Sequence, residues 1–389
     1  ELVAESLSAT VICDWTAMKL LRLCAHQVRL NEPLPWNVRN EPGHLLLGKG
    51  FLLTDQAQID TLMDRGVYVD QDEYEAHQRE LKAAQTRKDP FALWANILKR
   101  TGHLLRNHKD NPHFARELGE LSTTIQGAMK EDVNAGTFEM VYGDPTGYSV
   151  SHSLQTAFVA SLAAERFGWT ENDRTTLIRA ALTMNIAMLD MQNALTQQAT
   201  PLTPQQRAEI DAHPLKGRLI LESSNVSCQD WLRTVEQHHV TTDGRGLPQD
   251  RKDFSQLACM IHYTDVYLAK LSPRANRPAI AVNVAARELF LKSGGADNPY
   301  ASAIIKQMGI FPPGSFVKLA NGDTAVVLRP GDTANTPQVH SLISSDGWVF
   351  PDTKPRDTAK PEFKVVAAVP RGNVMMRLNR QKLFGYATA

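Results

Sequence analysis

The sequence predicts a mostly α-helical protein, with a central helical domain between a small α/β module and a β-rich C-terminal segment. Apolar residues recur at helical spacing through the middle of the chain, over 86–308. Over 1–85, glycines break short apolar runs, and over 309–389 prolines and glycines separate short β-rich runs. We therefore expect three parts with these bounds.

The composition excludes several classes of protein. Of 389 residues, 42 are basic and 42 are acidic, and the resulting zero formal charge argues against a nucleic-acid polymer as partner. No apolar run approaches the roughly 20 residues of a membrane helix. The four cysteines are too few and too scattered for a disulfide framework or a cysteine zinc site, and they suit a reducing, cytoplasmic compartment; they are Cys13, Cys24, Cys228 and Cys259.

The start of the chain carries little information. The first five residues lack the basic start and apolar stretch of a signal peptide. The sequence also lacks an initiator methionine, so we expect a trimmed chain.

Short elements are expected at both ends of the chain. In the first part, we expect a hairpin over 43–53, a helix from about 54 that ends at Gly66, a strand over 66–70 and a linker over 83–90. In the last part, we expect strands over 317–319, 324–328 and 339–343, separated by Asn-Gly-Asp and Pro-Gly-Asp turns. These strands would form a small antiparallel appendage.

The helical part has well-marked boundaries. We expect a helix over 150–167 that ends at Gly168, and a second that follows Thr170 and whose apolar stripe continues to Asn185. Thr203-Pro204 begins another helix, because threonine can cap, proline fits the first turn and Gln206 can complete a capping box.

Several of these helices carry a polar residue on their apolar stripe. A single inward histidine is most simply a core histidine satisfied by one hydrogen bond. Five such positions together favour a metal site, because imidazole and carboxylate suit zinc, iron or manganese. The five residues are His152, His213, His238, His239 and Asp265. A glycine-rich segment, 243–248, directly follows the histidine pair; alone it would be an ordinary turn.

With these motifs in this order, the sequence resembles the HD-GYP family of cyclic di-GMP phosphodiesterases over about 145–300. The resemblance implies that the five residues just named are metal ligands. It rests on Leu202-Thr203-Pro204, His213-Pro214 with Gly217, His238-His239 followed by Asp243-Gly244-Arg245-Gly246-Leu247-Pro248, and the Arg274 and Arg277 pair. The resemblance also implies that Asp243, Arg274 and Arg277 could meet the phosphate or guanine of a dinucleotide.

The chain departs from the family pattern at the pair that gives the HD domain its name. Where the family has His-Asp-Ile-Gly-Lys, this sequence has Met184-Asn185-Ile186-Ala187-Met188, and the signature glutamate and tyrosine are Val240 and Leu247. Asn185 is neutral and a poor bridge between two dications, and the thioether of Met184 is a soft ligand. Met188 removes a positive charge expected at a phosphate. We expect catalysis to be lost or severely reduced.

Three functions remain open on this basis. The first is a regulatory protein in cyclic di-GMP signalling, which binds the dinucleotide, a metal or a signalling partner without turnover. The second is a weak or altered phosphodiesterase that uses one Fe, Mn or Zn ion on His213, His238 and His239, because three histidines can hold one ion and leave a position for water. The third is a scaffold that binds no metal, with the histidines as core residues.

Overall fold

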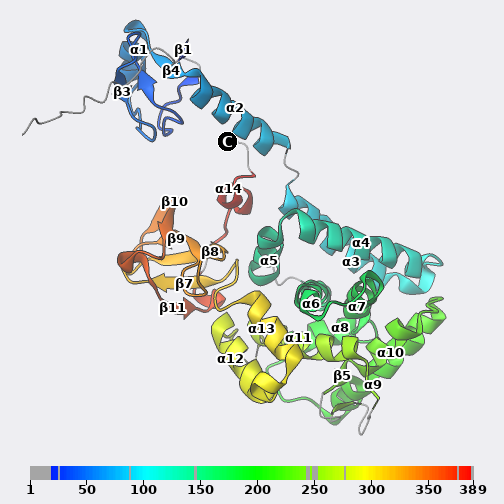
Figure 1. The fold of residues 1–389 in the computed structure, drawn as a ribbon. Helices are drawn as coiled ribbons and strands as arrows, with labels where there is room; N and C mark the ends of the chain where they lie inside the picture. The colour runs from blue at the N-terminus through cyan, green and yellow to red at the C-terminus, as the bar shows by residue number, and fades with distance from the viewer. Residues whose placement is uncertain are drawn as a thin grey trace, which may run out of the picture. The chain divides into compact units, whose positions relative to one another are not determined.

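The fold was analysed in a computed structural model, which describes residues 19–24, 27–86, 89–143, 147–241, 246–247, 253–275, 277–374 and 376–386 (Figure 1). The chain divides into two compact units, one that runs to Lys88 and one of Asp89–Ala387. The helical and β-rich parts that the sequence distinguishes thus lie in the same compact unit. No helix among the described residues is both long and apolar enough to cross a membrane.

The first unit is a four-stranded antiparallel sheet with two helices. Its strands are β1 (Leu20–Arg22), β2 (Val38–Arg39), β3 (Leu45–Leu47) and β4 (Tyr68–Asp70), in the order β1-β4-β2-β3. Its helices are α1 (Gln56–Asp64) and α2 (Gln71–Thr86). The side chains of Trp36, Val38 and Val69 form its core. The expected helix and strand are confirmed, with Asp55 capping α1 and Gly66 in the left-handed conformation that ends it.

Helix α2 corrects one expectation. It continues to Thr86, into the stretch over 83–90 that the sequence predicts as a linker. The helix has few apolar residues, so its sequence carries no clear apolar stripe.

The helical part of the second unit is built around one buried helix. Helix α6 (Tyr148–Ala164) is buried along almost its whole length and packs mainly against α7, α11 and α13. Figure 1 shows α6 among the other helices. These are α3 (Pro90–Arg106), α4 (Phe114–Glu131), α5 (Val133–Tyr142), α7 (Glu171–Thr183), α8 (Leu189–Gln197), α9 (Pro204–Ser223), α10 (Gln229–Gln237), α11 (Gln256–Leu271), α12 (Val282–Lys292) and α13 (Pro299–Met308).

The predicted helix starts are confirmed. Thr170 caps α7 in a capping box, and Thr203 caps α9 in a box that Gln206 completes. Helix α6 continues into a 3-10 turn, Glu165–Phe167, and Gly168 follows in the left-handed conformation. The stripe that the sequence extends to Asn185 is cut short, because α7 ends at Thr183 and residues 184–187 form a turn.

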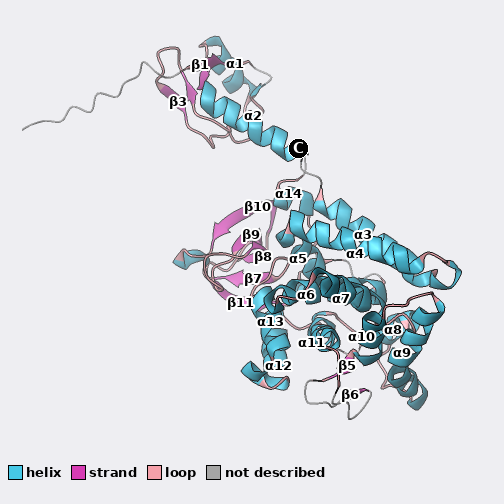
Figure 2. Cartoon of the chain, turned by 45° about the vertical axis from the view of Figure 1, so that its right-hand side comes forward, coloured by secondary structure: helices cyan, strands magenta, loops and turns pink. Residues whose placement is uncertain are grey.

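The β-rich part is a five-stranded antiparallel sheet that lies to one side of the helices (Figure 2). Its strands are β7 (Phe316–Leu319), β8 (Thr324–Arg329), β9 (Gln338–Ile343), β10 (Val349–Asp357) and β11 (Val365–Val369), in the order β10-β9-β8-β7-β11. The three expected strands are confirmed. Strands β10 and β11 form the two edges, and the sequence did not predict them: β10 contains two prolines and is largely exposed, so it lacks an apolar alternation.

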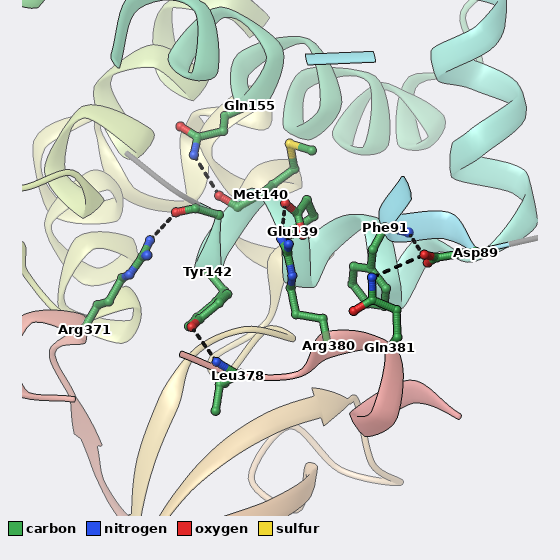
Figure 3. Close-up of polar contacts among 11 residues, drawn as sticks. Asp89, Phe91, Glu139, Met140, Tyr142, Gln155, Arg371, Leu378, Arg380 and Gln381 are labelled. Atoms are coloured by element: carbon green, nitrogen blue, oxygen red, sulfur yellow. Dashed lines mark hydrogen bonds and ion pairs between the residues drawn. The ribbon is translucent and has the colours of Figure 1, made fainter. Parts of the chain in front are cut away.

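The chain returns from the sheet to the helices through its C-terminal segment (Figure 3). Arg380 Nη1 donates to both carboxylate oxygens of Glu139, each at 2.5 Å. The Tyr142 hydroxyl accepts a hydrogen bond from the backbone N–H of Leu378 at 3.1 Å. Phe384, on the short helix α14 (Arg380–Phe384), packs edge-on against Phe91 with ring centroids 5.3 Å apart. These contacts fasten the β-rich part to α3 and α5.

Candidate metal centre

Three histidines from two helices and one strand meet in the second unit. His213 lies on α9, His238 directly follows α10, and His239 begins β5 (His239–Val240), which pairs with β6 (Gly246–Leu247). Their ligand nitrogens all lie within 4.8 Å of one another. The rings also contact one another, with centroids 4.2 Å apart for His238 and His239 and 5.0 Å apart for His213 and His238.

Close packing of α9 against α10 makes this meeting possible. Gly217 lies one turn after His213, and a Cβ at that position would lie 3.3 Å from Val235 Cγ1 and 3.8 Å from the carbonyl oxygen of Met184. The indole N–H of Trp231 on α10 donates to Thr183 Oγ1 at 2.8 Å, which ties α10 to the end of α7. The turn that contains Met184 is thereby held beside the histidines.

The hydrogen bonds of two rings settle which nitrogens face the centre. His213 Nδ1 lies 2.5 Å from the carbonyl oxygen of Ile210, and His238 Nδ1 lies 2.7 Å from that of Val235. A carbonyl oxygen only accepts, so both Nδ1 atoms must carry the proton and donate. Both Nε2 atoms of the neutral rings then present lone pairs, and they face each other at 3.1 Å.

Two facing lone pairs at this distance repel unless a cation lies between or beside them. A proton is disfavoured there, because burial lowers the pKa of His213 and, with the neighbouring rings, lowers the pKa of His238 well below its ordinary value. Burial also lowers the pKa of His239 to about 4. Neutral imidazoles at neutral pH are the form that binds a metal ion.

The separation of the two Nε2 atoms fits a shared ion. Two ligands at about 2.05 Å from a tetrahedral zinc ion would lie about 3.3 Å apart, close to the observed 3.1 Å. The two backbone carbonyls orient the rings through Nδ1, as the outer partners of metal-bound histidines usually do. The residues present therefore fit one ion such as zinc, iron or manganese, held by His213, His238 and His239.

His152 and Asp265 form a second pair near these three histidines. His152, on α6, is 1% exposed, and its Nε2 lies 2.5 Å from Asp265 Oδ1 on α11. Burial opposes ionisation of Asp265, but the hydrogen bond and charge of His152 outweigh it and lower the pKa of the carboxyl. The carboxylate also raises the pKa of all three histidines of the trio, so Asp265 lies close enough to act on their charge. In this arrangement, His152 and Asp265 bond directly to each other.

Of the three residues expected to contact a ligand, the structure places two. Arg274 lies near the site, with its Nη2 3.5 Å from the hydroxyl of Tyr148, whose ring stacks on His152 with centroids 5.1 Å apart. Arg277 donates to the carbonyl oxygen of Ala269 at 2.5 Å and forms a β-bridge with Arg274. Asp243 lies outside the described residues.

The substituted positions differ in burial. Met184 is completely buried and belongs to the main apolar core, whereas Met188 is only partly buried. Asn185 is 5% exposed. Val240, at the position of the signature glutamate, is completely buried.

Two further residues of this region were not predicted from the sequence. Tyr148 lies one turn before His152, and His262 lies one turn before Asp265 with its ring 6.4 Å from that of His239. Their positions could have indicated them, because each lies one helical turn before a candidate ligand and therefore on the same face of its helix.

Comparisons with known proteins agree with this geometry. A family model described as "HD domain" matches residues 142–296. The cyclic di-GMP phosphodiesterase PA4108 of Pseudomonas aeruginosa is 29% identical over 170 residues, which cover 43% of this chain and 41% of that protein. The 3'3'-cGAMP-specific phosphodiesterase 3 of Vibrio cholerae is 25% identical over 174 residues, 44% of this chain and 38% of that protein.

The chain thus covers about two fifths of the length of these curated relatives. Among solved structures, Bd1817, an HDG"Y"P protein from Bdellovibrio bacteriovorus, aligns with a TM-score of 0.49 and 15% identity, over 74% of this chain and 99% of that one. The match to the HD-domain model, the similarity to PA4108 and the order of the histidine motifs lead to one assignment: residues 142–296 are an HD domain, and its motifs are similar to those of the HD-GYP family.

Proposed function

We propose that the chain is a cyclic di-GMP signalling protein whose two-metal hydrolytic centre is impaired, and that it acts by binding a cyclic dinucleotide or a partner protein. The observation that carries this proposal is the Met184-Asn185 pair, buried at the position of the family's His-Asp pair and beside the histidine trio. The substrates named for PA4108 and the Vibrio protein support the choice of ligand.

The chemistry of hydrolysis explains why this pair matters. Cleavage of a phosphodiester on two metals uses a bridging hydroxide and a clamp on both oxygens of the displacement. Asn185 offers one neutral carbonyl oxygen where a bridging carboxylate would offset the charge of two dications, and Met184 offers only a thioether. Lost contacts of this kind cost more than about 1.4 kcal/mol, which is a tenfold rate effect.

The remaining groups favour binding. His213, His238 and His239 would hold one divalent ion, which would supply a Lewis acid for a phosphate oxygen. His152 and Asp265 would stabilise the edge of the site through the hydrogen bond between them. Arg274, which lies over the face of Tyr148, would meet a phosphate or a guanine, and Arg277 and Asp243 would assist.

A second candidate function is a weak or altered metal-dependent phosphodiesterase. The observation in its favour is that the Nε2 lone pairs of His213 and His238 face each other, so both could bind one ion. Such an ion would keep a further coordination position for water. Such an enzyme would run on one ion and would need another group in place of the family's pair.

The test combines turnover with binding. The protein is purified anaerobically, supplied with ferrous or manganous ion and incubated with cyclic di-GMP, with an active HD-GYP enzyme as control; binding is measured by calorimetry. We expect binding without hydrolysis. Clear metal-dependent hydrolysis would favour the second candidate, and the absence of both binding and hydrolysis would contradict both the binding and the turnover of cyclic di-GMP.

The metal part is tested separately by substitution. His238→Ala removes a ligand of the trio, and His103→Ala on α3 is the matched control, because His103 is exposed on a different helix. Metal analysis should find about one ion per chain in the parent and the control, and nearly none in His238→Ala. Equal metal content in all three proteins would exclude the trio as the site.

A further inference from the structure

A cavity lies at the seam between the helices and the β-sheet of the second unit. Its walls come from α5, α6, the end of α11 with the segment that follows it, and strands β7 and β11. Figure 3 shows part of this seam, with Met140 and Gln155 on the helical side and Arg371 on the other. The cavity shares no residue with the histidine trio.

The cavity has the size for a small molecule. The cavity has a volume of about 70 Å³, which exceeds the roughly 10–15 Å³ that a single water needs. Two hydrogen bonds stabilise the walls: Arg371 donates to the carbonyl oxygen of Gly143, and Gln155 donates to that of Met140 at 2.9 Å. The space is therefore a preformed feature of the seam.

The lining is mainly apolar. Leu268, Ile280, Ile310, Phe316 and Val369 supply aliphatic and aromatic surface from both sides of the seam. Such a lining holds water weakly, since a buried water needs two to four polar partners. It favours an apolar occupant with few polar atoms.

One polar group in the wall lacks a partner. Ser151 lines the cavity and is 8% exposed, and its Oγ has no hydrogen bond within the described parts of the chain. A buried hydroxyl without a partner costs free energy, and a ligand oxygen would recover it. The Oγ itself is covered in the present rotamer, so it would have to rotate to another staggered χ1 position to meet such an atom.

From these observations we propose that the seam cavity is a binding site for a small, mainly apolar molecule that carries one hydroxyl group, of the class of simple phenols and alcohols. The apolar part packs between Leu268 and Phe316, and the hydroxyl exchanges a hydrogen bond with Ser151. The site also touches the candidate metal centre, because Tyr148 forms part of the cavity wall and stacks on His152.

The test uses two probes of equal shape, phenol and toluene, with binding to the full chain followed by calorimetry and ligand-observed NMR. The variants are Ser151→Ala and its control Ser153→Ala, which lies on the same helix, is fully buried and likewise lacks a partner, but does not line the cavity. Ala279→Leu fills the cavity from its wall.

We expect Ser151→Ala to weaken the binding of phenol by about fivefold or more, which is the equivalent of one hydrogen bond. The same substitution should change the binding of toluene by less than about twofold. Ala279→Leu should weaken the binding of both probes by about tenfold or more, and Ser153→Ala should leave the binding of both unchanged. The ring ¹⁵N signals of His152 should shift when phenol binds, because the stacked Tyr148 ring lies in the cavity wall.

Two results would overturn the proposal. Equal binding of phenol by the parent and by Ala279→Leu would place the phenol elsewhere. Equal losses in Ser151→Ala and Ser153→Ala would show that the hydroxyl of Ser151 makes no specific contact. Neither result depends on whether the chain binds metal or cyclic di-GMP, so this test is independent of the proposed function.

Discussion

At positions 184 and 185, the side chains decide how many metal ions the centre can hold. Met184 is fully buried in the apolar core, and Asn185, which is 5% exposed, carries a neutral amide. Replacing them by Met184→His and Asn185→Asp together would supply the imidazole and the carboxylate that the family pattern has at these two positions. We expect about two ions per chain instead of about one, and turnover of cyclic di-GMP at least about tenfold above the parent.

Metal analysis and a hydrolysis assay measure these two effects. Met188→Lys serves as the control for metal content only, because it restores the positive charge expected at a phosphate without adding a metal ligand. If the double variant folds with an unchanged metal content, a group other than this pair limits the site.

The buried histidines also make stability depend on pH in the metal-free protein. Burial lowers the pKa of His239 to about 4, whereas an unfolded histidine titrates near 6.5. Between these values the unfolded state binds more protons, so the free energy of unfolding should fall as the pH falls from about 6.5 to 4. Each such ring contributes at most about 1.4 kcal/mol per pH unit.

Urea unfolding in the presence of a chelator, at several pH values between 7.5 and 5, measures this slope. His239→Gln should flatten it, because the amide does not titrate. A slope that His239→Gln leaves unchanged would assign the pH dependence to other groups.

At the scale of elements, the sequence predicts what is local and misses what depends on packing. The helix starts after Thr170 and Thr203 are local signals, and both were predicted, the second with its capping box. The five candidate ligands were expected from stripes and from the resemblance, and their role as a metal site stays a prediction. Helix α2 and strand β10 were not predicted from the sequence, because α2 is largely polar and β10 is exposed and contains prolines. Tyr148 lies one helical turn before His152, so the spacing could have indicated it, but its ring was not read as part of the site.

The approach of α9 to α10 gives a prediction about this packing. Gly217→Val would force its side chain into Val235 and Ile186, and would move His213 away from His238. Gly127→Ala on α4 is the contrasting change, because a Cβ there meets nothing within 4 Å. Metal affinity should fall about tenfold or more in Gly217→Val. In Gly127→Ala it should stay the same, and stability should rise by up to about 1 kcal/mol.

Metal titration and thermal unfolding of the two variants check these expectations. Unchanged metal affinity in a folded Gly217→Val protein would mean that the trio tolerates a wider separation of α9 and α10.

At the scale of the whole molecule, the two compact units predict two unfolding transitions. The first unit has its own core around Val69, and the second has larger cores that join helices and sheet. Val69→Asp on β4 and Val327→Asp on β8 are matched changes, since each puts a carboxylate at a completely buried strand position. Burial of an unpaired charge is strongly destabilising, so each variant should lower the transition of its own unit only.

Calorimetry of the full chain separates these effects, and metal analysis adds a second measure. Val69→Asp should leave the metal content unchanged, because all five candidate ligands lie in the second unit. Val327→Asp should lower the temperature at which the metal is released, because the sheet is fastened to α3 and α5 by Arg380, Tyr142 and Phe384. A single transition that both variants shift equally would show that the two units unfold together, and the metal centre would then depend on the N-terminal module for its stability.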